Sequence, residues 1–236
     1  MSNNKLIVAL DMNSREEALE LVEEIRDKVG VFKVGLELFN ASGPQIIHEI
    51  QSLGVRVFYD AKFHDIPNTV SQAVSVATRL GVWMINVHCA GGLEMLRAAR
   101  ESVIHTAKEL NQSPPLLIGV TLLTSIQEKI LHDELGIPGT IESTVLRYAR
   151  LAKEAGLDGV VCSGHEIVVL RKEFGKDFCL VVPGIRPSWS VQTSDQKRIM
   201  TPKQAIDAGA DYLVIGRPIT QSPDPIEAVT KILEEI

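Results

Sequence analysis

The residues with the clearest chemical potential lie in one short segment, 60–69, which reads Asp-Ala-Lys-Phe-His-Asp-Ile-Pro-Asn-Thr. Asp60 and Lys62 close a β-branched apolar run, and because side chains alternate along a strand we expect both to face the same side. Asp65 follows where the chain enters a helical pattern. Two carboxylates that flank one amine hold it protonated, so the pattern favours proton donation by Lys62 over Schiff-base chemistry.

Two further predicted strands add charges of both signs to this group. Asp11 follows Val-Ala-Leu, and Lys33 lies within Phe-Lys-Val-Gly. A charged side chain late in an apolar strand is costly unless it is paired at the open end of the sheet. We therefore expect Asp11, Lys33, Asp60, Lys62 and Asp65 to form a cluster of alternating charge. Such a cluster would stabilise a developing carbanion by fixed positive charge and then protonate it.

A second group of residues indicates phosphate binding. The last predicted strand ends in Val-Ile-Gly-Arg-Pro, which places Gly216 and Arg217 at its carboxyl end. In many barrels the loops after the seventh and eighth strands hold a phosphate through backbone N–H groups, and arginine adds a bidentate donor. The loop after the seventh predicted strand carries Arg186 and an Asp-Gln-Lys-Arg run that includes Gln196.

The elements that must position these residues alternate along the chain. Amphipathic stretches such as 14–28, 44–53, 69–80 and 93–110 predict helices between short apolar runs that predict strands. Apolar strands that alternate with helices indicate a parallel sheet covered on both faces, and eight such units indicate a closed barrel. The sequence therefore predicts an α/β fold, a (β/α)8 TIM barrel, as one domain over 1–236. The strands are expected at 5–11, 31–36, 55–62, 82–88, 116–121, 159–163, 178–182 and 212–215.

Charge and composition limit the partners and the compartment. Lys and Arg total 24 against 30 Asp and Glu, and a formal charge of −6 gives no long-range attraction to nucleic acid or anionic lipid. No apolar run approaches about 18 residues and no leader is visible, so neither a membrane span nor secretion is expected. Three widely spaced cysteines favour a reducing, cytoplasmic setting. His88 lacks a recognisable set of companion ligands, so we interpret it as structural.

Over essentially its whole length the sequence resembles the orotidine 5′-monophosphate decarboxylase family, in its shorter bacterial form. The fingerprint D-x-K-F-x-D-I-P-N-T stands intact at 60–69. Further family motifs follow in family order at 8–11, 32–35, 86–92, 121–125, 183–186, 195–196 and 215–218. The resemblance implies a homodimer with shared active sites that converts orotidine 5′-monophosphate to UMP, the last step of UMP biosynthesis. It implies no metal and no organic cofactor.

The resemblance also implies a role for each matched residue. Lys62 would protonate C6 of the pyrimidine after CO2 leaves, and Asp60 would lie beside the departing carboxylate. Lys33 joins their charge network, to which the partner subunit would contribute Asp65; Thr69 would also reach across the dimer. The other implied contacts are to substrate: ribose hydroxyls for Asp11 and Lys33, the pyrimidine for Thr124, and the phosphate for Gln196, Gly216 and Arg217, with Arg186 in a lid.

Two other functions remain open on the sequence alone. A Mg-dependent sugar-phosphate decarboxylase or aldolase of the same superfamily would share the Asp-x-Lys-x-x-Asp core but lack the Ile-Pro-Asn-Thr continuation, and its activity would not survive EDTA. A noncatalytic nucleotide-binding barrel would bind UMP without turnover. The charge cluster argues against simple binding, which does not need Lys62 between two carboxylates.

Overall fold

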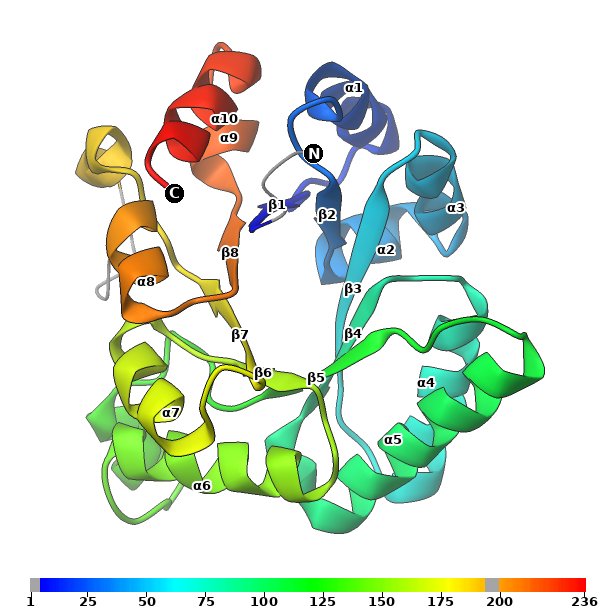
Figure 1. The fold of residues 1–236 in the computed structure, drawn as a ribbon, viewed down its shortest axis with the longest axis vertical. Coiled ribbons are helices and arrows are strands. Elements are labelled where there is room, and N and C mark those ends of the chain that lie inside the picture. Colours follow the sequence, from blue (N-terminus) through cyan, green and yellow to red (C-terminus); the bar gives the residue numbers. More distant parts are fainter. Residues whose placement is uncertain (1–4, 194–199) are drawn as a thin grey trace.

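The computed structural model describes residues 5–193 and 200–236. Its eight strands close into a parallel barrel, in which each strand pairs with the next and β8 returns to β1 (Figure 1). The (β/α)8 architecture predicted from the sequence is therefore confirmed. The strands are β1 (Leu6–Ala9), β2 (Val31–Val34), β3 (Arg56–Phe63), β4 (Met84–His88), β5 (Leu116–Val120), β6 (Gly159–Val161), β7 (Cys179–Pro183) and β8 (Tyr212–Ile215).

Helices surround the barrel on its outside (Figure 1). In some of them a side chain caps the first turn: the Ser14 side chain accepts a hydrogen bond from the Glu17 amide, and Thr201 and Gln204 form a capping box. No helix in the described ranges is long and apolar enough to cross a membrane. The helices are α1 (Arg15–Ile25), α2 (Leu36–Ser42), α3 (Gln45–Ser52), α4 (Pro67–Arg79), α5 (Gly92–Glu109), α6 (Ile141–Glu154), α7 (Ile167–Phe174), α8 (Pro202–Ala208), α9 (Arg217–Thr220) and α10 (Pro225–Glu234).

The two faces of the sheet build two separate cores, because successive side chains of a strand point to opposite faces. In β1, Leu6 and Val8 pack in the larger core under the helices, whereas Ile7 and Ala9 pack inside the barrel. Since apolar side chains fill the barrel interior, a polar site has to form at the rim. The interior core consists of Ile7, Ala9, Val31, Phe58, Met84, Ile118, Val181 and Val214.

Several strands are shorter than the sequence pattern predicts, and the difference falls at the rim. The pattern extends the first strand to Asp11, but β1 ends at Ala9, and one further backbone hydrogen bond joins the Leu10 amide to the Lys33 carbonyl. Leu36, predicted at the end of the second strand, begins α2 and is 54% exposed. Apolar composition continues past the point where the strands part, so it overestimates strand length.

Candidate active site

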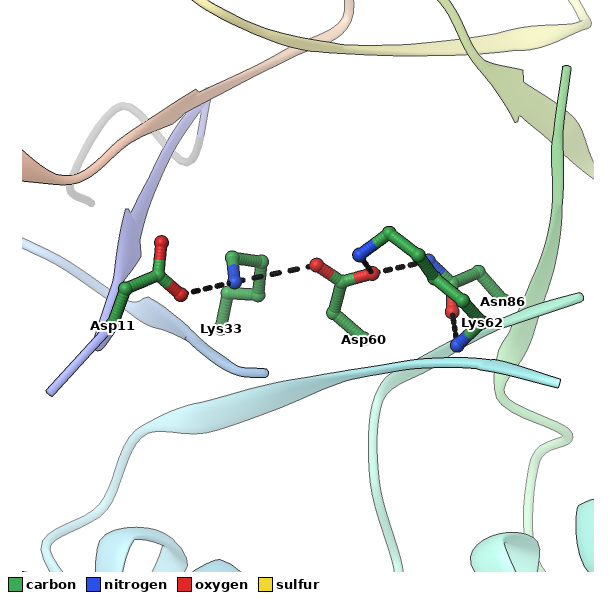
Figure 2. Close-up of polar contacts among 5 residues, drawn as sticks. All are labelled: Asp11, Lys33, Asp60, Lys62 and Asn86. Carbon is green, nitrogen blue, oxygen red and sulfur yellow. Dashed lines mark hydrogen bonds and ion pairs between the residues drawn. The ribbon is translucent and has the colours of Figure 1, made fainter. Parts of the chain in front are cut away.

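Four of the charged residues identified in the sequence meet at the carboxyl ends of β1, β2 and β3. Lys33 Nζ lies 2.7 Å from Asp11 Oδ1 and 3.2 Å from Asp60 Oδ2. Lys62 Nζ lies 2.7 Å from Asp60 Oδ1. Figure 2 shows the resulting row of alternating charge, Asp11–Lys33–Asp60–Lys62, which we call the charge chain.

Asp60 is the central carboxylate of the charge chain, and only 11% of its side chain is exposed. Burial alone would raise its pKa. The positive charges of Lys33 and Lys62, with hydrogen bonds from Lys62 and Asn86, outweigh burial, and the pKa of Asp60 lies below its ordinary value. Asp60 is therefore ionised at neutral pH, which places a fixed negative charge beside the Lys62 ammonium.

Lys33 is the buried cation of the charge chain, with 9% of its side chain exposed. Burial would lower its pKa, but the charges of Asp60 and Asp11 outweigh burial and raise it. Gly35 borders the same ammonium, because a Cβ at this position would lie 2.8 Å from Lys33 Nζ and 3.2 Å from Asp11 Oδ1. Glycine at position 35 thus leaves the space that this ion pair occupies.

Asn86 belongs to the site although sequence reasoning gave it no role. Its side chain lies buried in β4, where Nδ2 donates to Asp60 Oδ1 at 2.6 Å. Its Oδ1 accepts a hydrogen bond from the Lys62 backbone amide at 2.7 Å. One feature of the sequence could have identified Asn86: it is a polar residue within the apolar run Met-Ile-Asn-Val. A buried amide needs hydrogen-bond partners for both its oxygen and its nitrogen, so other polar groups have to lie beside it.

The charge chain lines a cavity of about 400 Å³ at the barrel rim. The cavity continues to the ends of β7 and β8, where Arg217 begins α9 directly after Gly216. Arg186 also lines it; its side chain is buried, and Nη1 donates to the Ile185 carbonyl at 3.1 Å. The cavity thus joins a charged end to an arginine-bearing end. Of the residues singled out in the sequence, its lining includes Asp11, Lys33, Asp60, Lys62, Thr124, Arg186, Gly216 and Arg217.

Two other sequence-predicted site residues, Asp65 and Thr69, are not brought into this cavity. Asp65 is exposed, and its Oδ1 accepts a hydrogen bond from the Ile66 amide, so the five-residue cluster has four members within a single chain. Thr69 is also exposed, in the first turn of α4. Gln196 lies outside the described residues. The alternation of side chains along a strand could not predict where the Asp65 side chain points, because Asp65 lies beyond the end of β3.

His88 ends β4 next to the charge chain, but it stacks near another histidine. The ring centroids of His88 and His64 are 5.3 Å apart. Burial, together with the charges of His64 and Lys62, lowers the pKa of His88 to about 4. His88 is therefore neutral at physiological pH. Within residues 5–193 and 200–236, no group of three or more His, Cys, Asp or Glu side chains is placed to hold a metal ion.

The fold and the cavity together indicate the class of protein to which this chain belongs. In (β/α)8 enzymes the reacting groups stand at the carboxyl ends of the strands, and a phosphate commonly binds after strands seven and eight. Here a Lys–Asp–Lys row, buried at Lys33 and Asp60 and half-buried at Lys62, occupies the ends of β2 and β3, and Arg217 follows β8. The site is that of a barrel enzyme whose cavity has carboxylates and ammonium groups at one end and arginine side chains at the other.

Comparison with known proteins gives the family. The family model described as "Orotidine 5'-phosphate decarboxylase / HUMPS family" matches residues 4–232, and the chain belongs to this family. It is 51% identical to the orotidine 5'-phosphate decarboxylase of Syntrophomonas wolfei, over 100% of this chain and 98% of that protein. The decarboxylase of Heliobacterium modesticaldum is 49% identical, with 100% and 96% covered. The crystal structure of the Lactobacillus acidophilus decarboxylase has a TM-score of 0.86 at 36% identity, covering 98% of each chain.

Proposed function

We propose that this chain is a carboxy-lyase that converts orotidine 5′-monophosphate to UMP and CO2. Family membership and the approximately 50% identity to decarboxylases over the full chain support this activity. The observation that carries the catalytic roles is the charge chain, in which Lys62 Nζ stands 2.7 Å from Asp60 in a substrate-sized cavity. A sugar-phosphate reaction or simple nucleotide binding is not favoured by these relatives.

The reaction breaks the bond between C6 and the carboxylate, and the electron pair stays on C6 in the plane of the ring. This pair cannot delocalise into the π system, so electrostatic stabilisation has to come from the site. Lys62 supplies a positive charge near C6 and then donates its Nζ proton to the carbanion. The negative charge of Asp60 repels the substrate carboxylate beside it, and this repulsion is relieved when the carboxylate leaves as neutral CO2. Solvent returns the proton to Lys62.

The remaining lining residues hold the substrate. Asp11 has 55% of its side chain exposed and, with Lys33, binds the ribose hydroxyls. Thr124 contacts the pyrimidine. Arg217, Gln196 and the Gly216 backbone bind the phosphate, and Arg186 belongs to a lid over it. Binding energy from the phosphate, far from C6, contributes to lowering the barrier at C6.

We also propose that the chain forms a homodimer in which the partner subunit contributes Asp65 and Thr69 to each site. Their exposure in a single chain leaves both side chains available for such a contact. A cytoplasmic location is also proposed. The three cysteines carry no disulfide, and burial raises the pKa of Cys89 and of Cys179 to about 12, which keeps these thiols protonated.

Reaction in D2O tests the chemistry directly. We expect 1H NMR to show UMP formed from orotidine 5′-monophosphate without an H6 signal, because the new C6 hydrogen comes from solvent by way of Lys62. A product other than UMP, or UMP that still carries a proton at C6 in D2O, would refute the proposed reaction.

Subunit mixing tests the shared site. Lys62→Ala and Asp65→Ala should each be nearly inactive, and a mixture should regain activity because a hybrid dimer contains one site with both residues. Native mass spectrometry is run alongside to show that subunits exchange. Exchange without any regained activity would contradict the contribution of Asp65 from the partner.

A further inference from the structure

The pairing of β3 with β4 is irregular at the catalytic residues. Tyr59 pairs with Ile85 and Phe63 pairs with Val87, so residues 60–62 lie opposite a single residue of β4, Asn86. An insertion of this kind leaves backbone groups without ladder partners and bends the strand. The bulge therefore falls on Asp60 and Lys62, and Asn86 is the residue across from both.

The backbone of Lys62 has an unusual conformation at this bulge. Its φ is +51°, in the left-handed region that a side chain with a Cβ rarely adopts. In the described part of the chain only Asn111 shares this property among residues other than glycine. A conformation of this kind persists where surrounding contacts hold it. The contact seen here is the hydrogen bond from the Lys62 amide to Asn86 Oδ1.

The Asn86 amide has a single consistent orientation. The Lys62 N–H can only donate, so the atom that faces it is an acceptor, Oδ1. The other end, Nδ2, then donates to Asp60 Oδ1, which also receives Lys62 Nζ. One buried side chain thereby fixes the Lys62 backbone and the Asp60 carboxylate to which the Lys62 ammonium is paired (Figure 2).

We infer that Asn86 is a positioning residue for proton delivery: it holds the bulge that aims the Lys62 ammonium along Asp60 into the cavity. This inference rests on the proposed function, because it concerns the same Lys62. Asparagine suits the position because one short side chain supplies both a donor and an acceptor. Alanine supplies neither group, and aspartate supplies the acceptor but, when ionised, no donor.

Three variants test the role of Asn86. Asn86→Ala removes the hydrogen-bond acceptor of the Lys62 amide and one of the hydrogen-bond donors to Asp60 Oδ1. Asn86→Asp keeps the shape but sets a second carboxylate against Asp60. The matched control is Thr78→Val in α4, which removes a buried side-chain hydrogen bond, 2.9 Å to the Val74 carbonyl, away from the cavity lining. For each we would measure kcat and KM for orotidine 5′-monophosphate, the Kd of UMP by calorimetry and folding by circular dichroism.

We expect kcat of Asn86→Ala to fall roughly 10- to 100-fold, the effect of losing one or two buried polar contacts in the reacting geometry. The Kd of UMP should change by less than about threefold, because ribose and phosphate are bound by other elements. Thr78→Val should keep kcat within about twofold. A kcat of Asn86→Ala within threefold of wild type, or equal losses of kcat and UMP affinity, would overturn the positioning role.

The dependence of kcat on pH in Asn86→Asp gives a further test, because a general structural defect would not change this dependence. Lys33 and Lys62 face Asp60 from β2 and β3, and neutral His88 lies on β4 beside them. Two neighbouring carboxylates share a proton at a raised pKa, and the shared proton restores a donor to Asp60. The ratio of variant to wild-type kcat should therefore rise as the pH falls from 8 to 5, and a flat ratio would overturn the inference. Wild type without any turnover would refute the proposed function instead, so the two failures are distinguishable.

Discussion

Replacing Lys33 by methionine removes the cation that joins the two carboxylates of the charge chain while keeping most of the side-chain volume. Lys33 Nζ contacts Asp11 and Asp60 at 2.7 and 3.2 Å, and its side chain is 9% exposed. Removing one partner of a buried ion pair costs about 3–5 kcal/mol of unfolding free energy, because the other charge remains buried. Asp60 keeps Lys62 and Asn86, and Asp11 is half exposed, so the loss should lie near the lower value, about 3 kcal/mol.

The loss should depend on pH, with a sign set by the two ionised groups. The lowered pKa of Asp60 means that its stabilisation is present above the unfolded pKa of about 3.9 and is lost as the pH falls through the folded value. The raised pKa of Lys33 means that its contribution is complete below about pH 10 and is lost as the pH rises through its folded value. In Lys33→Met the buried Asp60 loses the nearby charge that lowers its pKa most, so it takes up a proton at a higher pH than in the wild type. The penalty of Lys33→Met should therefore be complete at pH 7 and smaller near pH 4.

Urea unfolding at pH 7 and pH 4, with thermal melts, measures this penalty. A loss of about 3 kcal/mol corresponds to a fall in Tm of roughly 6–12 °C for a chain of this size. Lys203→Met is the matched control, since it breaks an exposed pair with Asp207 at 3.1 Å that should be worth less than about 0.5 kcal/mol. A Lys33→Met protein as stable as its control at pH 7, or a penalty that does not change with pH, would show that the ion pairs of Lys33 do not stabilise the fold.

Three other substitutions give further expectations. Gly35→Ala should fold but lose about tenfold in kcat/KM for orotidine 5′-monophosphate, because its Cβ would lie 2.8 Å from Lys33 Nζ and force the ammonium to move; unchanged kinetics would show that the space is not needed. Arg217→Ala should raise KM roughly 10- to 100-fold with little change in Tm, since it removes the proposed charge-assisted contact between an exposed side chain and the phosphate; an unaltered KM would remove Arg217 from the phosphate site. Gly159→Ala should destabilise the barrel by about 3 kcal/mol in urea unfolding, because a Cβ there would overlap the Cys179 carbonyl of β7; wild-type stability would contradict this.

The sequence predicted the barrel and the meeting of Asp11, Lys33, Asp60 and Lys62 for one physical reason. Parallel strands bring their carboxyl ends to a common rim, so charges placed late in adjacent strands have to meet there. The alternation rule also put Asp60 and Lys62 on the same side. The contact between them forms, but across a bulge and with Lys62 at a φ of +51°, which no pattern of apolar and polar residues indicates.

Other parts of the site depend on information that a residue pattern does not contain. The role of Asn86 requires the register between β3 and β4, which is set by pairing across the sheet. The position of Asp65 depends on the loop after β3, whose path is set by its own contacts, including the bond from the Ile66 amide. The ends of β1, β2, β5 and β6 were overestimated for the related reason that apolar composition does not report where neighbouring strands separate.

We propose that Lys62 makes this chain a metal-independent decarboxylase of orotidine 5′-monophosphate. The most direct measurement is the change in ultraviolet absorbance as this substrate is consumed in excess EDTA, for the wild-type protein and for Lys62→Ala. We predict conversion to UMP by the wild type and its loss in Lys62→Ala, with the variant still folded and still binding UMP. Activity that requires added metal would contradict a metal-independent reaction, and activity that survives in Lys62→Ala would contradict the role of Lys62 as proton donor.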